Sequence, residues 1–258
     1  MIKVTVWNEF VQEQADVKVQ PCMKNWKLDE EGRRHVAASA QKIRALHGEG
    51  IHATLRDLFS EDADVQVSHI GTLDMPECGL TEEVLADTDV LVWWAHVAHD
   101  FVPDSVVARV CDHVRRGMGI IFLHSAHLCK PLTTLLGTSC TLRWRDGDTE
   151  NLWCCNPMHP IARGVPACIH LEKEEMYGEF FDIPAPDELI FLGSFAGGEV
   201  FRSGCVWNRG YGKVFYFQPG HETNPSYFQP DIRKILKNAV HYVANPGFRL
   251  EKLECLSV

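Results

Sequence analysis

The stretch Gly117–His127 reads GMGIIFLHSAH, and it decides the fold class of the chain. Four consecutive apolar residues, 120–123, follow a glycine pair. A run that is apolar at every position is typical of a strand buried on both faces, as in a parallel sheet. The run ends directly in His124, Ser125 and His127. Because open α/β sheets bind ligands beyond the carboxyl ends of their strands, this strand directs an imidazole and a hydroxyl toward the expected site.

Three further apolar runs end in the same way, with polar or ionisable residues close behind. Residues 3–7 are followed by Asn8 and Glu9, and residues 90–94 by His96 and His99. Residues 213–217 are followed by His221 and Glu222. One such strand end would mean little, but four in one chain predict a shared polar crevice. We therefore expect His96, His124 and His221 to converge at one edge of the sheet.

Helical patterns separate these strands. Apolar spacing and capping residues predict helices over residues 28–46, 51–59, 81–86, 103–116 and 231–243. A further strand is expected at 65–70. The alternation of strand and helix is the pattern of an α/β fold with a doubly wound, mostly parallel sheet of the flavodoxin-like type.

The alternation of strands and helices stops between residues 138 and 201, where turn signals such as Asp146-Gly147 separate short strand candidates. These candidates are 140–144, 151–155, 168–171, 189–192 and 200–202. We interpret them as antiparallel elaboration on the sheet edge. Residues 1–245 are expected to form one domain, in which 11–47 is an inserted segment that serves as a peripheral cap or as an oligomer contact. Residues 246–258 are expected to be a loose tail.

The composition and net charge limit the kinds of partner that the chain is expected to bind. The chain has 258 residues, 45% of them hydrophobic, and a formal net charge of -10. This charge argues against nucleic acid or an anionic membrane as the main partner, and favours a neutral or polar small molecule. No run of about 18 apolar residues and no signal-peptide pattern is present, so a cytoplasmic protein without a membrane span is expected. The ten cysteines are scattered without a C-x-x-C pair, which favours reduced thiols.

The segment WWAHVAHD at 93–100 combines aromatic and imidazole groups. His96 and His99, in a His-x-x-His pattern, could bind one metal ion or one substrate. Trp94 is a candidate wall for a sugar ring. Alternatively, Trp93 and Trp94 point to opposite faces of the strand and only pack.

The segment His124-Ser125 lies at a predicted strand-to-helix turn, which exposes a side chain at the top of a sheet. Ser125 could be a nucleophile activated by a neighbouring imidazole. However, the glycines that flank the serine of a nucleophile elbow are absent. An acid–base role for His124 is therefore favoured over nucleophilic catalysis by Ser125.

The run 174–179 (EEMYGE) places three carboxylates close together. It reads equally well as a solvated acidic turn and as a loop that supplies Glu175 as an acid–base or ligand group and Tyr177 as a substrate contact. Arg143 and Arg202 are candidate donors to substrate hydroxyls. His221 with Glu222 resembles a base followed by an acidic residue that orients it or holds the backbone or a metal.

A divalent metal ion, with zinc favoured, is compatible with these residues. Catalytic zinc sites use three protein ligands drawn from His and carboxylates. His96, His99 and His127 are the named candidates, but no diagnostic spacing such as H-E-x-x-H supports them, so a metal-free mechanism stays open. Nothing indicates a nucleotide cofactor.

Five segments in order resemble the trehalose-utilisation (ThuA-like) family, whose fold is similar to the class I glutamine amidotransferase fold. They are 90–100 (VLVWWAHVAHD), 117–127 (GMGIIFLHSAH), 174–184 (EEMYGEFFDIP), 197–205 (GGEVFRSGC) and 212–222 (GKVFYFQPGHE). The resemblance runs from about residue 50 to residue 243. Where the amidotransferases carry a nucleophilic cysteine, this chain has His124-Ser125, so glutaminase activity is not expected.

The resemblance implies a role in disaccharide or keto-sugar catabolism. Our leading hypothesis is a sugar-acting enzyme of the lyase, hydrolase or isomerase type, in which His124 and His221 move protons and the ligand is a small-molecule sugar. The alternatives are a non-catalytic sugar-binding or regulatory module and a hydrolase that uses Ser125. A homo-oligomer is compatible with all three.

Overall fold

The computed structural model describes residues 1–18, 22–23 and 29–253. Its centre is one nine-stranded sheet with the strand order β2-β1-β3-β4-β9-β8-β7-β5-β6. The first five strands in this order pair in parallel. They are β2 (Val65–Thr72), β1 (Ile2–Asn8), β3 (Val90–Trp94), β4 (Gly119–Leu123) and β9 (Gly212–Phe217).

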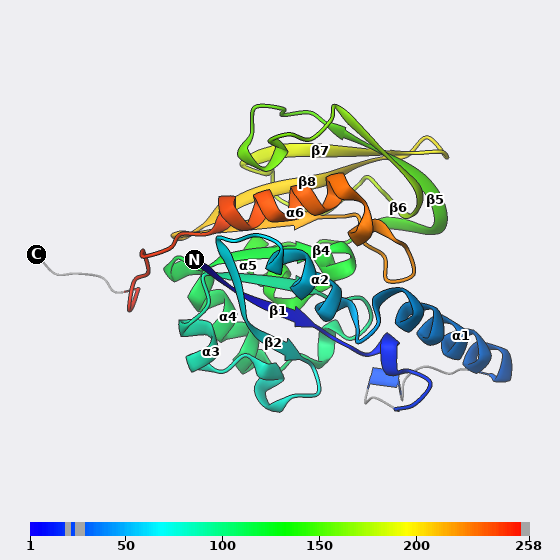
Figure 1. The fold of residues 1–258 in the computed structure, drawn as a ribbon, viewed down its shortest axis with the longest axis horizontal. Helices are drawn as coiled ribbons and strands as arrows, with labels where there is room; N and C mark the ends of the chain where they lie inside the picture. Colours follow the sequence, from blue (N-terminus) through cyan, green and yellow to red (C-terminus); the bar gives the residue numbers. More distant parts are fainter. Residues whose placement is uncertain (19–21, 24–28, 254–258) are drawn as a thin grey trace, which may run out of the picture.

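The other half of the sheet is antiparallel, as the sequence predicts for the sheet edge. It consists of β8 (Val200–Arg209), β7 (Glu188–Phe195), β5 (Arg143–Cys154) and β6 (Cys168–Gly178). The fold is therefore α/β with a mostly parallel centre and an antiparallel extension. In Figure 1, the antiparallel strands form the upper part of the molecule and the parallel strands the lower part.

Helices cover both faces of the parallel strands. They are α2 (Ile51–Ser60), α3 (Glu82–Ala86), α4 (Asp104–Arg116), α5 (Lys130–Leu136) and α6 (Pro230–Val243), and a further helix, α1 (Glu30–His47), lies beside the sheet. Short 3-10 helices are η1 (Gln12–Gln14), η3 (Pro76–Gly79), η4 (His99–Phe101), η5 (His124–Leu128), η6 (Pro160–Ala162) and η7 (Ser226–Phe228). Among the described residues, no helix combines the length and the apolar character needed to cross a membrane.

Strand β4 explains why two cores form. Its side chains alternate between the faces, so Ile120 and Phe122 pack in the core covered by α3, α4 and α5. Ile121 and Leu123 pack in the second core, against α2 and α6. All four side chains are fully buried, which accounts for the unbroken apolar run in the sequence.

Helix α1 differs from the other helices because it covers neither core. Figure 1 shows it beside the sheet, at the end toward which β1 points. Asp29 caps its first turn by accepting from Gly32 N, and Gly48 follows its last residue with φ 62°. The predicted start of this helix at Leu28 lies outside the described residues. Part of the segment 11–47 is thereby held close to the strand ends where a site is expected.

Two predicted elements differ from the structure. Strand β5 runs through Asp146 and Gly147, where the sequence signals a turn, because the register with β6 shifts between Arg145 and Asp148 and absorbs the extra residue. Strand β6 extends to Gly178, so the acidic run is a paired strand and not a turn.

The segment after α6 also differs from expectation in its described part, 246–253. Arg249 is not in a loose tail, because its guanidinium donates to the carbonyls of Leu85 and Thr88 at 2.6 and 2.5 Å. The backbone N–H of Leu250 donates to the carbonyl of Arg116. Residues 254–258 lie outside the described residues.

Candidate active site at the strand ends

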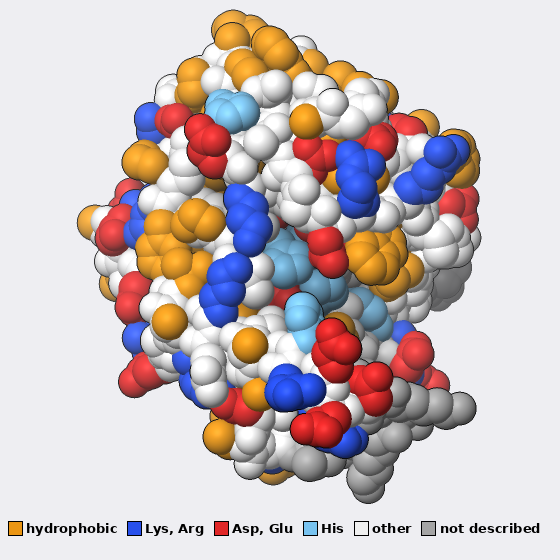
Figure 2. Space-filling model, turned by 90° about the vertical axis from the view of Figure 1, so that its right-hand side faces the viewer, with side chains coloured by type: hydrophobic (Ala, Val, Ile, Leu, Met, Phe, Trp, Pro, Cys, Tyr) orange, Lys and Arg blue, Asp and Glu red, His pale blue; other side chains and the backbone are white. Residues whose placement is uncertain are grey.

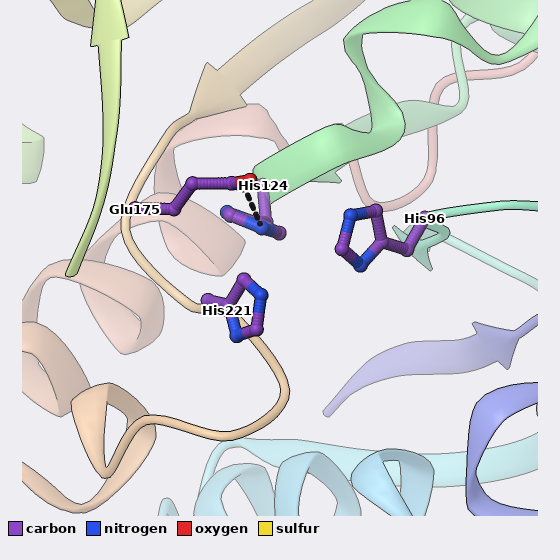
Figure 3. A group of neighbouring side chains, drawn as sticks. All are labelled: His96, His124, Glu175 and His221. Atoms are coloured by element: carbon purple, nitrogen blue, oxygen red, sulfur yellow. Dashed lines mark ion pairs between the residues drawn. The ribbon is translucent and has the colours of Figure 1, made fainter. Parts of the chain in front are cut away.

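Three imidazole rings from three different strand ends meet at one point. The ring centroids of His96 and His124 are 5.4 Å apart, those of His96 and His221 are 5.4 Å apart, and those of His124 and His221 are 5.3 Å apart. Figure 3 shows the three rings turned toward one another. The convergence expected from the ends of β3, β4 and β9 is present, although His96 and His221 lie 125 positions apart along the chain.

Glu175 on β6 completes the cluster. Its Oε2 lies 3.1 Å from His124 Nε2, and ligand atoms of all four side chains lie within 4.8 Å of one another. Burial alone would raise the pKa of this carboxyl, but the interaction with His124 and the charges of His96 and His221 hold it below its ordinary value. Glu175 is therefore a carboxylate at neutral pH.

The ring of His124 is oriented by its backbone and by one hydrogen bond. The residue has φ 53°, in the left-handed region, and its ring is fully buried. Its Nδ1 lies 3.1 Å from the carbonyl oxygen of Gln218, which can only accept. Nδ1 therefore carries a hydrogen toward that carbonyl, and Nε2 faces the carboxylate of Glu175.

His96 is oriented by an acidic partner. Its Nδ1 donates to Glu222 Oε2 at 2.8 Å. Burial lowers the pKa of His96, but the charge and hydrogen bond of Glu222 outweigh it and raise the pKa to about 9. In return, the pKa of Glu222 lies well below its ordinary value, because the histidine charges outweigh its burial. The pair places a positive ring on one side of the cluster.

His221 has the opposite arrangement. Its Nδ1 accepts a hydrogen bond from the backbone N–H of Thr223 at 3.1 Å. Burial, with the charges of His124 and His96, lowers its pKa to about 4 against the opposing effect of Glu222. The ring is thus neutral at neutral pH and carries its hydrogen on Nε2.

The donor set of the cluster fits a divalent cation. Two lone-pair nitrogens can be supplied by His96 and His124, whose Nδ1 atoms are both held by acceptors. Glu175 Oε2 is buried and lies 3.1 Å from His124 Nε2. Three imidazoles and a carboxylate are the ligand types of zinc, whereas His99 and His127 lie outside the four-residue group.

The cluster lies at the inner end of a cleft of about 550 Å³. Figure 2 shows histidine side chains gathered in the middle of this face, with acidic and basic side chains around them. Helix α1 forms one wall, through His35, Val36, Ala38, Ser39 and Lys42. The β5 and β6 strands form the opposite wall, through Trp144, Asp146, Gly147, Lys173 and Glu175.

Trp94 does not form the sugar-binding wall that the sequence suggests. Its side chain has no exposed surface, and its Nε1 donates to the carbonyl of Gly220 at 3.2 Å. It faces the core under α6 and supports the loop that carries His221. The aromatic ring that does line the cleft is Trp144, which is 63% exposed.

Asn8 and Glu9 are buried below the site and do not line the cleft. Asn8 Nδ2 donates to Glu13 Oε1 at 2.7 Å. The carboxylate of Glu9 accepts from the backbone N–H groups of Val97 and Ala98 at 2.9 and 3.0 Å. The bonds to Glu9 shape the turn after His96, whereas the bond from Asn8 holds Glu13 in η1, so both residues act as structural supports.

Ser125 and Tyr177 bond to each other. The two hydroxyl oxygens are 2.5 Å apart, and both side chains are buried. The tyrosine ring stacks on His124, with a centroid distance of 5.3 Å. His127 is held behind them by its contact from Nδ1 to the carbonyl of Cys140 at 2.7 Å. Neither Ser125 nor His127 reaches the cleft.

The remaining predicted residues also lie away from the cluster. Neither ring nitrogen of His99 has a hydrogen-bond partner among the described residues, and burial lowers its pKa to about 3. Arg143 is exposed and does not line the cleft. Arg202 is occupied by Glu179, with bonds of 2.8 and 2.9 Å, and by the carbonyl of Phe181.

Four residues that contribute to the site are missing from the sequence prediction. Trp144, Lys42 and Lys173 line the cleft. Glu174 holds the loop that carries His221. Trp144 could have been suggested by its place next to Arg143 on an alternating strand, but no local signal singles out either lysine.

The fold and site together define an α/β protein with a histidine–carboxylate centre at the carboxyl ends of parallel strands. The chain belongs to the trehalose-utilisation family (ThuA), whose model matches residues 3–243. This membership supports a role in trehalose or sugar utilisation. No protein with curated annotation matches the chain.

Solved structures share the fold at low sequence identity. A ThuA-like protein from Parabacteroides merdae has a TM-score of 0.58 and 13% identity, with coverage of 98% of this chain and 92% of that one. A ThuA-like protein from Bacteroides uniformis has a TM-score of 0.53 and 14% identity, with coverage of 94% and 91%. A cytoplasmic protein from Salmonella typhimurium has a TM-score of 0.53 and 13% identity, with coverage of 74% and 86%.

Proposed function

We propose that this protein is an enzyme of disaccharide or keto-sugar utilisation whose chemistry is proton transfer at the His96, His124, Glu175 and His221 cluster. The observation that carries the proposal is the convergence of these four side chains, three of which, His96, Glu175 and His221, line one cleft. Acid–base catalysis needs groups of different protonation state within reach of the same substrate atoms. The cluster supplies such groups, because its members differ in pKa and in the position of their hydrogens.

Each group has a distinct task in this proposal. His124, whose Nδ1 is held by Gln218 and whose Nε2 lies against the carboxylate of Glu175, exchanges a proton with a substrate hydroxyl or an acidic C–H. His221, which is neutral and carries its hydrogen on Nε2, donates a hydrogen bond to a substrate oxygen. The positive ring of His96, held by Glu222, stabilises negative charge that develops on that oxygen.

We further propose that the cluster holds a divalent cation, with zinc as the first candidate. His96, His124, His221 and Glu175 would be its ligands. When bound, such an ion polarises a carbonyl or lowers the pKa of a bound water. Binding through Nε2 would require His96 to lose a proton, which would be released. It would also require the hydrogen of His221 to move from Nε2 to Nδ1, at the cost of the hydrogen bond from Thr223 N–H.

The test combines activity with metal content. Trehalose and its keto derivatives are incubated with the wild-type protein, with His124→Ala and with His221→Ala. The products are separated by chromatography and their amounts are measured. We expect product formation by the wild type and a loss of at least about 100-fold in each variant. His170→Ala is the matched control, because this histidine lies on the exposed side of β6 and bonds to Asn151.

Elemental analysis of the same four proteins tests the metal. We expect about one ion per chain in the wild type and in His170→Ala, and a strong loss in the other two. Retained turnover in both cluster variants would refute the catalytic proposal. Sugar binding without any product would favour the alternative, a non-catalytic sugar-binding or regulatory module.

A further inference from the structure

Two lysines face each other across the outer part of the cleft. Lys42 lies on the cleft-facing side of α1, on the same helical face as His35, Val36 and Ser39. Lys173 lies on β6, two residues before Glu175, so both side chains project from the same face of that strand into the cleft. The two ammonium groups are close enough that Lys173, more than burial, lowers the pKa of Lys42.

Neither lysine has a counter-ion in the part of the chain that the structure describes. Among the described residues, no carboxylate forms an ion pair with Lys42 or Lys173, although the chain holds 35 acidic and 25 basic residues. Asp146 lines the same cleft but is paired with neither. Lys3, Lys18, Lys130 and Lys237, by contrast, all have carboxylate partners.

The other acidic groups of the cleft do not offset this charge. Glu222 is paired with His96, and Glu175 lies against His124. Asp146 is one carboxylate against the two lysines, so this part of the cleft carries a net positive charge in a chain whose net charge is -10. Two like charges held side by side are unfavourable unless an anion lies between them, and such an arrangement favours anionic ligands over uncharged or cationic ones.

We propose that Lys42 and Lys173 form an anion-binding subsite, and that the ligand of the cleft is a saccharide that carries a carboxylate or a phosphate group. This inference rests on the proposed function for the sugar part of the ligand, but the anion subsite stands on the lysines alone.

The position of the subsite sets the size of the ligand. Lys173 and Glu175 are two residues apart on one strand, which separates their Cα atoms by roughly 6.5 Å. One sugar ring spans about that distance, so the charged group and the reacting carbon would lie at opposite ends of a single ring. The exposed ring of Trp144 lies on the same wall of the cleft and offers an apolar surface to such a ring.

The test is a calorimetric titration with four probes: inorganic phosphate, D-glucose 6-phosphate, D-gluconate and D-glucose. We expect at least one of the two charged sugars to bind at least about tenfold more tightly than glucose at low salt, with the difference shrinking as the salt concentration rises. The phosphorylated and carboxylated sugars separate the two anion chemistries. The affinity for inorganic phosphate measures anion binding at the subsite without any contribution from a sugar.

The variant Lys42→Met/Lys173→Met keeps the apolar stems and removes both charges. We expect it to lose the preference for anions and to bind phosphate at least about tenfold more weakly. Lys42→Arg/Lys173→Arg should restore the preference, and Lys234→Met, at a lysine that bonds to the carbonyl of Gly164, is the matched control. Thermal melts of each variant show whether it remains folded.

The outcomes separate the two proposals. Lysine-dependent phosphate binding without binding of any sugar supports the anion subsite and counts against the sugar function. Equal affinity for glucose and both charged sugars, or an anion preference unchanged in the double methionine variant, overturns the subsite.

Discussion

The carboxylate of Glu174 accepts a hydrogen bond from the backbone N–H of Gly220 at 3.1 Å and thereby ties β6 to the loop after β9. The same carboxylate accepts from the backbone N–H of His221 at 3.2 Å, from Asn224 Nδ2 at 3.3 Å and from Ser226 Oγ at 2.5 Å. One buried side chain thus fixes the loop that presents His221. Glu174 is a positioning residue, because it acts on the cluster through the backbone.

The substitution Glu174→Gln tests this role. The amide replaces one carboxylate oxygen by an N–H₂ group, which cannot accept and would face the N–H and O–H groups that now donate to that oxygen. We therefore expect a loss of about 3 kcal/mol of unfolding free energy and a fall in kcat of at least about tenfold. Faster hydrogen exchange of the amides of residues 220–226 would show that the loop is released. Glu172→Gln, at an exposed position of the same strand, is the control. Wild-type kcat and unchanged exchange would contradict the positioning role.

Trp94 and Trp144 should respond to substitution in opposite ways. Trp94→Phe removes a buried hydrogen bond and part of a fully buried ring, so we expect a loss of about 2 kcal/mol of unfolding free energy. Trp144→Ala should leave the melting temperature within about 2 °C and raise KM for the sugar roughly tenfold. Steady-state kinetics and thermal melts on both variants measure the two effects. The reverse pattern would show that the cleft-lining tryptophan is structural.

Ser125→Ala should retain activity within about threefold, because the hydroxyl is buried against Tyr177 and does not line the cleft. A nucleophilic serine would instead cost several orders of magnitude in kcat. Failure of an active-serine probe to label the wild-type protein would agree with this expectation. Labelling of wild-type protein that is absent in Ser125→Ala would revive the hydrolase alternative.

Glu13 should make stability depend on pH. Burial raises the pKa of this carboxyl to about 7, against the opposing hydrogen bond from Asn8. The folded protein keeps this proton up to about pH 7, whereas the unfolded chain loses it above about pH 4.5. The folded state therefore binds more protons in this range, and stability falls as pH rises from about 4.5 to about 7, by roughly 3 kcal/mol in all.

Glu13→Gln removes this titration. The difference in unfolding free energy between the variant and the wild type should shift by about 2 kcal/mol in favour of the variant between pH 5 and pH 8. Denaturant unfolding at both pH values measures it, with the exposed Glu31→Gln as the control. A difference that does not change with pH would mean that Glu13 ionises with an ordinary pKa.

The parallel half of the fold could be predicted because its signals are local. Strand β4 is apolar at every position since it is covered on both faces, and its predicted span differs from the observed one by a single residue, Gly119. The rule that parallel strands end at one edge then brought His96, His124 and His221 together without any knowledge of their partners. Glu175 was among the candidates only because its acidic run stood out.

The recognition residues could not be predicted in the same way, because their position depends on contacts between distant segments. Whether Trp94 is exposed depends on α6 and the loop after β9, which cover it. The sequence predicts Arg143 as a ligand contact, but its neighbour Trp144 lines the cleft instead. The face to which each side chain of this strand points is set by the pairing with β6 and not by the strand's own sequence. Lys42 meets Lys173 only because α1 lies against the strand ends.

Helix α1 belongs to neither hydrophobic core, yet it forms one wall of the cleft. The groups that move protons are carried by the sheet, while much of what a ligand first encounters is carried by an accessory helix outside it. Part of the ligand selectivity is thereby encoded outside the sheet that carries the chemistry. Exchanging α1 between relatives of this fold should therefore transfer ligand preference while the reaction itself stays the same.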